Sequence, residues 1–444
     1  MIIRFLTILV ILNFNFLYSQ SDERLSNITK KNSFNTLEDA LEQASSIIEL
    51  SLANKKLSEL PSVIEKFVNL QKLDLSNNEL TVLPDELTKL VHLEEIKLAA
   101  NKFDTFPDVL TKIHSLKKID LAYNSIKKIK SDIKSLKNLT FLKLSKNLID
   151  TFEGVRNILP NLQTLLLDRN KLKEIPTFIF KTDSLKILKI GNNLISELPE
   201  EIEELEYLHK LSINNNKISF LVDEITELKN LKELNIESNQ IKSLPESIGD
   251  LSNLTQLFVG QNYFTKFPKS VSKLNKLHTL HIANNNEKTL PEEIMLMKNI
   301  VSLDLSDNSL SDFPKFLDSL PKLSNLTIRN NNIIKIDSNI CNFRNIKKID
   351  LYDNDIEEIG TEISCMNNLL SLNLGKNNIL LIPDEITTLK SLKILILNEN
   401  KIEKFPENMF KLKNLRIIQV KNNNITKKSK KRLIKTMVKT KIYF

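Results

Sequence analysis

The chain has 444 residues, of which 41% are hydrophobic and 27% are charged, and this composition excludes an intrinsically disordered protein. The formal net charge is +8, but the segment from Lys427 to Lys441 carries eight basic residues and no acidic one. The rest of the chain is therefore formally neutral, which excludes a general trap for polyanions along its whole length.

The first residues have the pattern of a secretory signal peptide. Arg4 is the lone charge ahead of a mostly apolar run from Phe5 to Leu17, and the small residue Ser19 follows. Because this run is too short for a comfortable membrane span, we expect a signal peptide over residues 1–19, cleaved after Ser19. The mature chain would then be secreted or held in the cell envelope, without a lipid anchor because no cysteine follows the run. An uncleaved anchor or a misassigned start codon is the alternative.

Residues 20–35 are polar and are expected to form a flexible leader. The segment from Thr36 to Asp39 resembles a capping box, although Asp39 stands where Glu or Gln is usual. Apolar residues at helical spacing follow, namely Leu37, Ala40, Leu41 and Ala44. This pattern predicts a capping helix over residues 36–46.

One repeat accounts for most of the remaining chain. From Ile47 to Leu415 the pattern L-x-x-L-x-L-x-x-N-x-L-x-x-L-P-x-x-L-x-x-L-x-x recurs every 23 residues, giving sixteen complete repeats and a truncated seventeenth without insertion or deletion. Positions 4 and 6 alternate with positions 3, 5 and 7, which predicts a short half-buried strand. Positions 14, 18 and mostly 21 return to the same core, at a spacing that suits a helical turn or a short extended segment. We expect the seventeen strands to stack in parallel, because such units bury their apolar faces only against each other.

Position 9 is asparagine in sixteen of the seventeen repeats, with Lys55 as the exception. An asparagine amide has two donors and an acceptor, so a buried asparagine can satisfy backbone groups that the turn leaves unpaired. We expect a structural ladder formed by Asn78, Asn101, Asn124, Asn147, Asn170, Asn193, Asn216, Asn239, Asn262, Asn285, Asn308, Asn331, Asn354, Asn377, Asn400 and Asn423.

Position 15 is proline in eleven of sixteen repeats, which suits a chain that leaves the sheet after position 14. The residues that replace it are Lys130, Glu153, Val222, Asp337 and Gly360. The repeat at Leu139 is the least regular, since Arg156 occupies position 18 and Gly154 with Pro160 indicates a distorted outer turn.

A stacked sheet exposes an apolar edge at each end and needs caps there. After the repeats, residues 426–444 predict a basic helix over 429–439, with Leu433, Ile434, Met437 and Val438 as its apolar stripe, and a final strand over 441–444. We interpret this segment as a C-terminal cap. A basic tail that binds an acidic membrane surface or nucleic acid is the alternative.

The 23-residue pattern resembles the leucine-rich-repeat family in its class with a Leu-Pro pair, and the ending is similar to the caps of exported bacterial members. The resemblance covers residues 47–425. It implies an α/β fold, a right-handed horseshoe-shaped solenoid with a concave parallel β-sheet and short helical or extended segments on the convex side. It also implies a partner that is usually a protein, although sugars, lipids and nucleic acids are known ligands.

The concave face would carry the side chains at positions 3, 5 and 7 of each repeat, together with those at positions 8 and 10. At about 4.8 Å per strand, seventeen strands span roughly 80 Å, which favours an extended or protein ligand. A first candidate site, the aromatic–basic patch, places apolar residues beside cations, which is hot-spot chemistry. It comprises Tyr123, Phe141, Leu166 and Ile187 with Lys143, Lys146, Arg169 and Lys189.

The second candidate site, the Phe–His patch, comprises Phe258, Tyr263, His278 and His281 with Gln256 and Gln261. A third group, Ile394, Ile396 and Ile417, is expected to lie under the C-terminal cap. An acidic zone of Asp304, Asp307, Asp350 and Asp353 could steer a partner by charge. Drift on a tolerant surface is the alternative explanation for each patch.

The chemistry of an enzyme is absent from the pattern. His278 and His281 are three apart on one strand and would point away from each other, so we expect no metal site and no cofactor. No glycine-rich phosphate loop and no G-x-S-x-G segment occur. Cys341 and Cys365 fall on the outer side of adjacent repeats; two unpaired thiols are expected, and a disulfide is the alternative.

These observations favour an exported, non-enzymatic, protein-binding scaffold. The alternatives are an intracellular signalling scaffold, if the N-terminus is not a signal peptide, and adhesion to a cell surface or membrane through the basic tail. A polysaccharide is a second class of partner, and nucleic acid is disfavoured. Neither the ligand nor the oligomeric state follows from the sequence.

Overall fold

Three-residue strands recur every 23 residues in the computed structural model, which describes residues 32–33, 37–154, 159–285, 290–336, 338–343 and 345–444. Each strand covers positions 3 to 5 of a repeat, where the alternation of apolar and polar side chains predicted it. The strands are β2 (Glu49–Ser51), β3 (Lys72–Asp74), β4 (Glu95–Lys97), β5 (Lys118–Asp120), β7 (Phe141–Lys143), β9 (Thr164–Leu166), β10 (Ile187–Lys189), β11 (Lys210–Ser212), β12 (Glu233–Asn235), β13 (Gln256–Phe258), β14 (Thr279–His281), β15 (Ser302–Asp304), β16 (Asn325–Thr327), β18 (Lys348–Asp350), β20 (Ser371–Asn373), β21 (Ile394–Ile396) and β22 (Ile417–Gln419).

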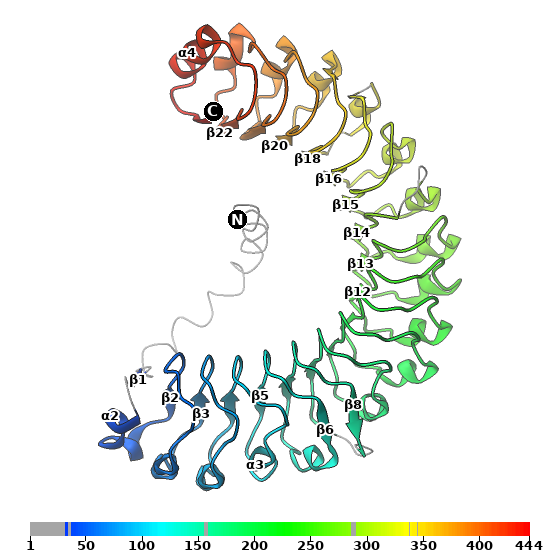
Figure 1. Ribbon diagram of the computed structural model, residues 1–444. Helices are drawn as coiled ribbons and strands as arrows, with labels where there is room; N and C mark the ends of the chain where they lie inside the picture. Colours follow the sequence, from blue (N-terminus) through cyan, green and yellow to red (C-terminus); the bar gives the residue numbers. More distant parts are fainter. Residues whose placement is uncertain (1–31, 34–36, 155–158, 286–289, 337, 344) are drawn as a thin grey trace.

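Neighbouring strands pair in parallel and in register, so that each residue faces its counterpart 23 positions away; Leu188, for example, pairs with Leu165 and Leu211. One further strand extends the sheet at each end: β1 (Asn32–Ser33) pairs with β2, and β23 (Lys441–Tyr443) pairs with β22. Figure 1 shows the result as a horseshoe with the strands along its inner, concave face. The expected leucine-rich-repeat solenoid is confirmed.

Short helices follow the strands on the outer side of the horseshoe (Figure 1). Most are 3-10 turns that begin one residue after position 15, where proline holds an extended backbone; Pro84, for example, has φ −72° and ψ 148°. The turns are η3 (Ser62–Lys66), η4 (Asp85–Lys89), η5 (Ser131–Ser135), η6 (Thr177–Lys181), η7 (Glu200–Glu204), η8 (Asp223–Glu227), η9 (Ile248–Asp250), η10 (Lys269–Lys273), η11 (Glu292–Leu296), η12 (Lys315–Ser319), η13 (Ser338–Asn342), η14 (Thr361–Cys365), η15 (Asp384–Thr388) and η16 (Glu407–Lys411), with the α-helix α3 (Asp108–Thr111) in one repeat.

Two small parallel sheets lie on the outer side, away from the main sheet. β6 (Lys128–Lys130) pairs with β8 (Thr151–Glu153), and β17 (Lys335–Ile336) pairs with β19 (Glu358–Ile359). Both fall where two successive repeats lack the proline of position 15. The expected distortion of the repeat at Leu139 takes this form, with Gly154 at φ 66°, whereas Arg156 lies outside the described residues.

The core is one continuous cluster of buried aliphatic side chains that runs the length of the solenoid. It is formed by the recurring Leu and Ile residues of each repeat, and Phe67, Phe103 and Phe264 are among its largest fully buried side chains. Each repeat therefore depends on its neighbours for burial, as a one-dimensional array must.

The position-9 asparagines connect adjacent repeats by hydrogen bonds. In one rung, Asn262 Oδ1 accepts a hydrogen bond from the Ile241 N–H (3.0 Å), and its Nδ2 donates to the carbonyl oxygens of Ile236 (2.9 Å) and Val259 (3.1 Å). Most of the asparagines are buried, but Asn124, Asn216 and Asn423 are only half-buried. Within the described chain Ser270 Oγ is the one buried side-chain polar atom without a hydrogen-bond partner.

The first repeat is covered by α2 (Leu37–Leu41) and the short turn η2 (Ala44–Ser46), with Leu37, Ala40 and Ala44 buried. Thr36, the expected capping residue, lies outside the described residues, as do the expected signal peptide over residues 1–19 and most of the leader. Over the part of the chain that the structure describes, no helix is long and apolar enough to cross a membrane.

At the other end α4 (Lys427–Thr436) begins with Thr426, whose side chain accepts a hydrogen bond from the Ser429 N–H. Leu433 and Met437 are buried against the last repeat. The expected inward placement of Ile434 and Val438 is wrong, because these two side chains are 54% and 84% exposed. Ile434 lies about 100° around α4 from Leu433, away from the buried face, and Val438 lies in the turn after the helix.

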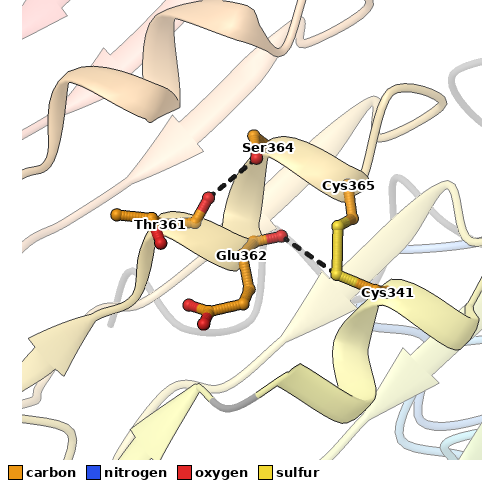
Figure 2. The surroundings of a disulfide bond; sticks show 5 residues. All are labelled: Cys341, Thr361, Glu362, Ser364 and Cys365. Atoms are coloured by element: carbon orange, nitrogen blue, oxygen red, sulfur yellow. Dashed lines mark hydrogen bonds between the residues drawn. A yellow bond between two sulfur atoms is a disulfide. The ribbon is translucent and has the colours of Figure 1, made fainter.

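The two cysteines form a disulfide, so the expectation of two unpaired thiols is wrong. Cys341 in η13 and Cys365 in η14 have Cα atoms 5.0 Å apart, within the range that a disulfide spans. Figure 2 shows the bond joining successive outer turns, with Cys341 beside the carbonyl oxygen of Glu362. The close stacking of the outer turns brings positions 19 and 20 of adjacent repeats together, which counting along one repeat does not reveal.

Candidate binding surface

The strand geometry fixes which side chains the concave face offers. In each strand the central residue is buried and its two neighbours point away from the core, so positions 3 and 5 form continuous columns along the inside of the horseshoe. Adjacent residues in a column lie about 4.8 Å apart. A ligand on this face therefore meets side chains of successive repeats in a fixed order.

The aromatic–basic patch spans β5 to β10. The pairing places Phe141 beside Thr164 and Thr164 beside Ile187, and it places Lys143, Leu166 and Lys189 in the next column. All of these side chains are half-buried and remain accessible from the inside of the horseshoe. Phe141 and Ile187 are thus separated in their column by Thr164 and do not contact each other as direct neighbours.

Tyr123 and Lys146 form a joined pair at position 8 of successive repeats. The Lys146 ammonium donates a hydrogen bond to the Tyr123 hydroxyl (2.5 Å) and lies 4.0 Å from the centre of the ring. This hydrogen bond and the charge of Lys146 lower the pKa of Tyr123. The Tyr123 side chain is still 53% exposed, so most of it is accessible to a partner.

Position 8 has a left-handed backbone throughout the repeats, a feature that we did not predict. Tyr123, Lys146 and Arg169 have φ values of 58°, 58° and 60°. Asparagine is the commonest residue at this position, in seven of seventeen repeats, and this enrichment is the sequence signal that could have revealed the conformation. Three large side chains in succession occupy a backbone conformation that favours small polar residues, which marks the patch as unusual.

The charges of the patch are only partly compensated. Lys143 forms an ion pair with Asp120 (2.9 Å), whereas Arg169 and Lys189 form no ion pair with any residue that the structure describes. Asp168, whose carboxylate interacts with the charge of Lys189, accepts a hydrogen bond from the Gly191 N–H (3.2 Å), and burial raises its pKa. The patch is therefore cationic beside accessible apolar side chains.

The Phe–His patch begins at β13, three strands beyond β10. The rings of Phe258 and His281 are 4.6 Å apart and tilted by 56°, and the His281 Nδ1 atom is 3.9 Å from Asp304 Oδ2. Burial lowers the pKa of His281, although Asp304 acts in the opposite direction. His278 is exposed on the strand edge, and Tyr263 is exposed beyond the turn, so neither joins the stacked pair.

The acidic zone is largely compensated by its own neighbours. Asp350 forms an ion pair with Arg329, and Asp353 forms one with Lys376 (2.5 Å). The Asp304 carboxylate accepts hydrogen bonds from the Ser306 N–H and hydroxyl, and Asp307 accepts one from Asn330. The zone thus presents less free charge than its sequence suggests. The third group, Ile394, Ile396 and Ile417, is half-buried near the C-terminal strand.

No group of three His, Cys, Asp or Glu residues that could hold a metal ion occurs among the described residues. The concave face offers hydrogen-bonding, apolar and charged contacts to a ligand.

Three family models match successive parts of the chain: "Leucine Rich repeats (2 copies)" over residues 68–111 and 114–157, "Leucine rich repeat" over 160–218, and "Leucine-rich repeat region" over 222–332. A solved leucine-rich-repeat protein of Leptospira interrogans is 31% identical, with a TM-score of 0.74, over 94% of this chain and 100% of that one. The chain belongs to the leucine-rich-repeat family.

Two more distant structures share the fold. The ectodomain of a plant membrane receptor kinase from Arabidopsis thaliana, in complex with CASPARIAN STRIP INTEGRITY FACTOR 2, is 24% identical with a TM-score of 0.53, over 85% of this chain and 53% of that one. The functional domain of InlJ from Listeria monocytogenes, which includes a cysteine ladder, is 19% identical with a TM-score of 0.50, over 87% and 70%. A search among curated proteins found no match. Leucine-rich-repeat folds commonly bind proteins, and scaffolds of this family are typically without catalysis.

Proposed function

We propose that this chain is an exported, non-enzymatic scaffold that binds a protein ligand on its concave face, with the aromatic–basic patch as the principal contact. The observation that carries the proposal is the run of Tyr123, Lys146 and Arg169 on three successive left-handed turns, beside the accessible Phe141. Aromatic and arginine side chains are the residues that most often dominate binding energy in protein interfaces.

The charge of the patch indicates the chemistry of the ligand. Arg169 and Lys189 offer cations that form no ion pair with any residue described, although the charge of Lys189 also acts on Asp168. Apolar Leu166 and Ile187 lie beside them in the strand columns. A ligand segment that combines a carboxylate with an apolar side chain would satisfy both, and the guanidinium of Arg169 suits a two-point contact with a carboxylate.

Export is supported by two independent features. The first is the signal-peptide pattern of residues 1–19, and the second is the disulfide between Cys341 and Cys365, since disulfides persist in oxidising compartments. Sequencing of the mature N-terminus in the native host tests this part: cleavage after Ser19 is the expected result. If the chain still accumulates outside the cytoplasm after deletion of residues 1–19, these residues are not the signal for export, and another export route is favoured.

The binding proposal is tested by capture of partners from the extracellular and envelope fractions of the host. The purified chain is compared with Phe141→Asp and Arg169→Glu, and bound proteins are quantified by mass spectrometry. Phe220→Asp is the matched control, because Phe220 is 55% exposed but lies outside the concave strands.

We expect one set of partners to be lost, at least ten-fold, with both patch variants and to be kept with Phe220→Asp. Circular dichroism must show that all three variants fold. Partners that bind the patch variants as well as the wild-type chain would exclude the aromatic–basic patch, and the same experiment with Phe258→Asp would then test the Phe–His patch.

A further inference from the structure

The C-terminal helix α4 has a second face that the fold does not use. Its inner face is fully engaged, because Ser429, Leu433 and Met437 are buried against the last repeat. A cap requires only this inner face. Two large apolar side chains are nevertheless exposed: Ile434 of α4 at 54% and Val438, just after the helix, at 84%.

Lysines surround these two apolar residues. At about 100° per residue, Lys427, Lys431 and Ile434 lie on one stripe of α4, with Lys435 and Lys428 on its flank. Val438 follows two residues after the end of the helix. From Lys427 to the end of the chain no acidic residue occurs. The outer face is therefore a small apolar centre within a ring of positive charge.

The cations of α4 divide into structural and unengaged groups. Arg432 belongs to the structure, since its guanidinium donates to the Phe405 carbonyl oxygen (2.6 Å) and pairs with Glu407 (2.7 Å). Lys430 lies 4.2 Å from the centre of the Phe444 ring. By contrast Lys427, Lys431 and Lys435 form no ion pair with any described residue. Their charge is available to an external anion.

The combination of residue types favours a lipid surface over other polyanions. Lysine is a compact, mobile charge that suits the diffuse field of anionic headgroups, while exposed Ile and Val gain by entering the apolar boundary below them. Single-stranded nucleic acid is bound instead by aromatic stacking together with arginine, and this stripe offers neither.

We propose that the outer face of α4, together with Val438 in the turn that follows it, docks on an anionic phospholipid surface. Lys427, Lys431 and Lys435 would lie at the headgroups, and Ile434 and Val438 at the apolar boundary. Figure 1 places α4 at the C-terminal end of the horseshoe, on the side away from the concave strands. Docking through α4 leaves the concave face open. This inference rests on α4 alone and stands or falls independently of the proposed protein ligand.

Vesicle sedimentation tests the charged part of the surface. The purified chain is mixed with vesicles of phosphatidylcholine alone or of phosphatidylcholine with phosphatidylglycerol. We expect binding to the mixed vesicles only, weakening as salt rises. The combined variant Lys427→Glu, Lys431→Glu and Lys435→Glu should bind at least ten-fold more weakly. The combined Lys66→Glu, Lys89→Glu and Lys134→Glu variant is the matched control: it makes the same change of net charge at exposed lysines on the outer side of the first repeats, and should bind normally.

Fluorescence tests the apolar part, because the chain contains no tryptophan. Val438→Trp places a single tryptophan at the most exposed apolar position of the proposed surface, and its emission should shift to shorter wavelength with the mixed vesicles only. Phe220→Trp, exposed elsewhere on the solenoid, should not shift. Ile434→Ser combined with Val438→Ser should weaken vesicle binding several-fold at constant charge and an unchanged melting temperature.

Four results would overturn the inference. The first is no binding of the wild-type chain to mixed vesicles at low salt. The second is an equal loss of binding in the matched lysine control, which would make the attraction a property of net charge. The third is an unshifted Val438→Trp emission with the mixed vesicles, which would show that the apolar residues do not enter the bilayer. The fourth is tighter binding to a single-stranded DNA oligonucleotide than to the vesicles, which would assign the face to another polyanion.

Discussion

At the scale of single residues, two neighbouring positions of the turn have different physical roles. Position 9 supplies an asparagine whose amide joins the backbone of two repeats, as Asn262 does for Ile236, Ile241 and Val259. Position 8 supplies a left-handed residue whose side chain is directed to solvent. Position 9 is constrained because its amide must satisfy buried backbone groups. Position 8 can carry a side chain that contacts a ligand, at a modest conformational cost of the left-handed backbone.

Replacement of Asn262 by Ala should destabilise the chain by about 1–3 kcal/mol, because the Ile241 N–H and the Ile236 and Val259 carbonyl groups would lose their buried partner. Urea unfolding measures the change, and amide hydrogen exchange at Ile241 locates it. Asn423→Ala, in the half-buried last rung, is the control and should have a smaller effect. Equal stability of wild type and Asn262→Ala would contradict a structural role for the rung.

Tyr123→Asn should separate binding from stability. Asparagine tolerates the left-handed backbone at φ 58° better than tyrosine, but the hydrogen bond and ring contact with Lys146 are lost. These opposing effects should leave the free energy of unfolding within about 1 kcal/mol of wild type. Binding of the captured partner should nevertheless fall. A variant that keeps full affinity would show that the Tyr123 ring is not part of the contact.

His281 should make stability depend on pH. Burial lowers its pKa below the value of about 6.5 that histidine has in an unfolded chain. Below that pH the unfolded state binds more protons than the folded state, so stability falls as the solution is acidified from neutral pH. Urea midpoints measured between about pH 7 and pH 5 should decline less in His281→Gln than in wild type. Parallel declines would contradict the assignment.

At the scale of elements, the strands were predictable because their period of two recurs unchanged in every repeat, and the core positions follow from the same register. The outer side was less predictable, since its apolar spacing fits a helical turn or an extended segment equally well. The small outer sheets β6–β8 and β17–β19 could not be predicted from any single repeat, because each needs the same change in two successive repeats. Both occur where two successive repeats lack proline, at Lys130 with Glu153 and at Asp337 with Gly360.

Val222 shows why a single missing proline is not enough. Its neighbours at the same position are Pro199 and Pro245, and the 3-10 turn η8 follows Val222 as in the regular repeats. Pairing of two outer strands needs a free backbone N–H in both adjacent repeats, and proline has none. The binding patches were less predictable still. The residues of a patch can be assigned from the register, but the pairing of Asp350 with Arg329, or of Lys146 with Tyr123, depends on side-chain geometry.

The disulfide should stabilise the two outer turns η13 and η14. It closes a loop with a sequence separation of 24 residues, and chain entropy predicts a contribution of roughly 2–4 kcal/mol. The double variant Cys341→Ser and Cys365→Ser should therefore unfold at a lower urea concentration. Its amide exchange should increase, relative to wild type, more in β18 and β20 than in β3 and β4. Reductant should lower the stability of the wild-type chain and leave the double variant unchanged; an insensitive wild-type chain would argue against the bond.

At the scale of the whole molecule, the solenoid has no single centre. Its stability is the sum of repeat and interface terms, so each end is a weak point unless it is covered. The C-terminal cap meets this need with main-chain bonds as well as apolar contacts: the Val420 N–H donates to the Tyr443 carbonyl oxygen (2.8 Å), and the Lys441 N–H donates to that of Arg416 (2.8 Å). The same cap carries the lysine ring, so structural and surface roles coincide in one short segment.

Deletion of residues 427–444 should therefore damage the solenoid itself. It removes β23 from the edge of β22 and uncovers the core beneath Leu433 and Met437. Exposed strand edges and apolar ends promote association between chains. We expect less soluble protein, and oligomers in size-exclusion chromatography, whereas the Lys427→Glu, Lys431→Glu and Lys435→Glu variant should keep the solution state of the wild type, because its three substitutions lie on the outer face. A monomeric deletion variant with an unchanged melting temperature would mean that the last repeat is stable alone and that α4 serves only its outer surface.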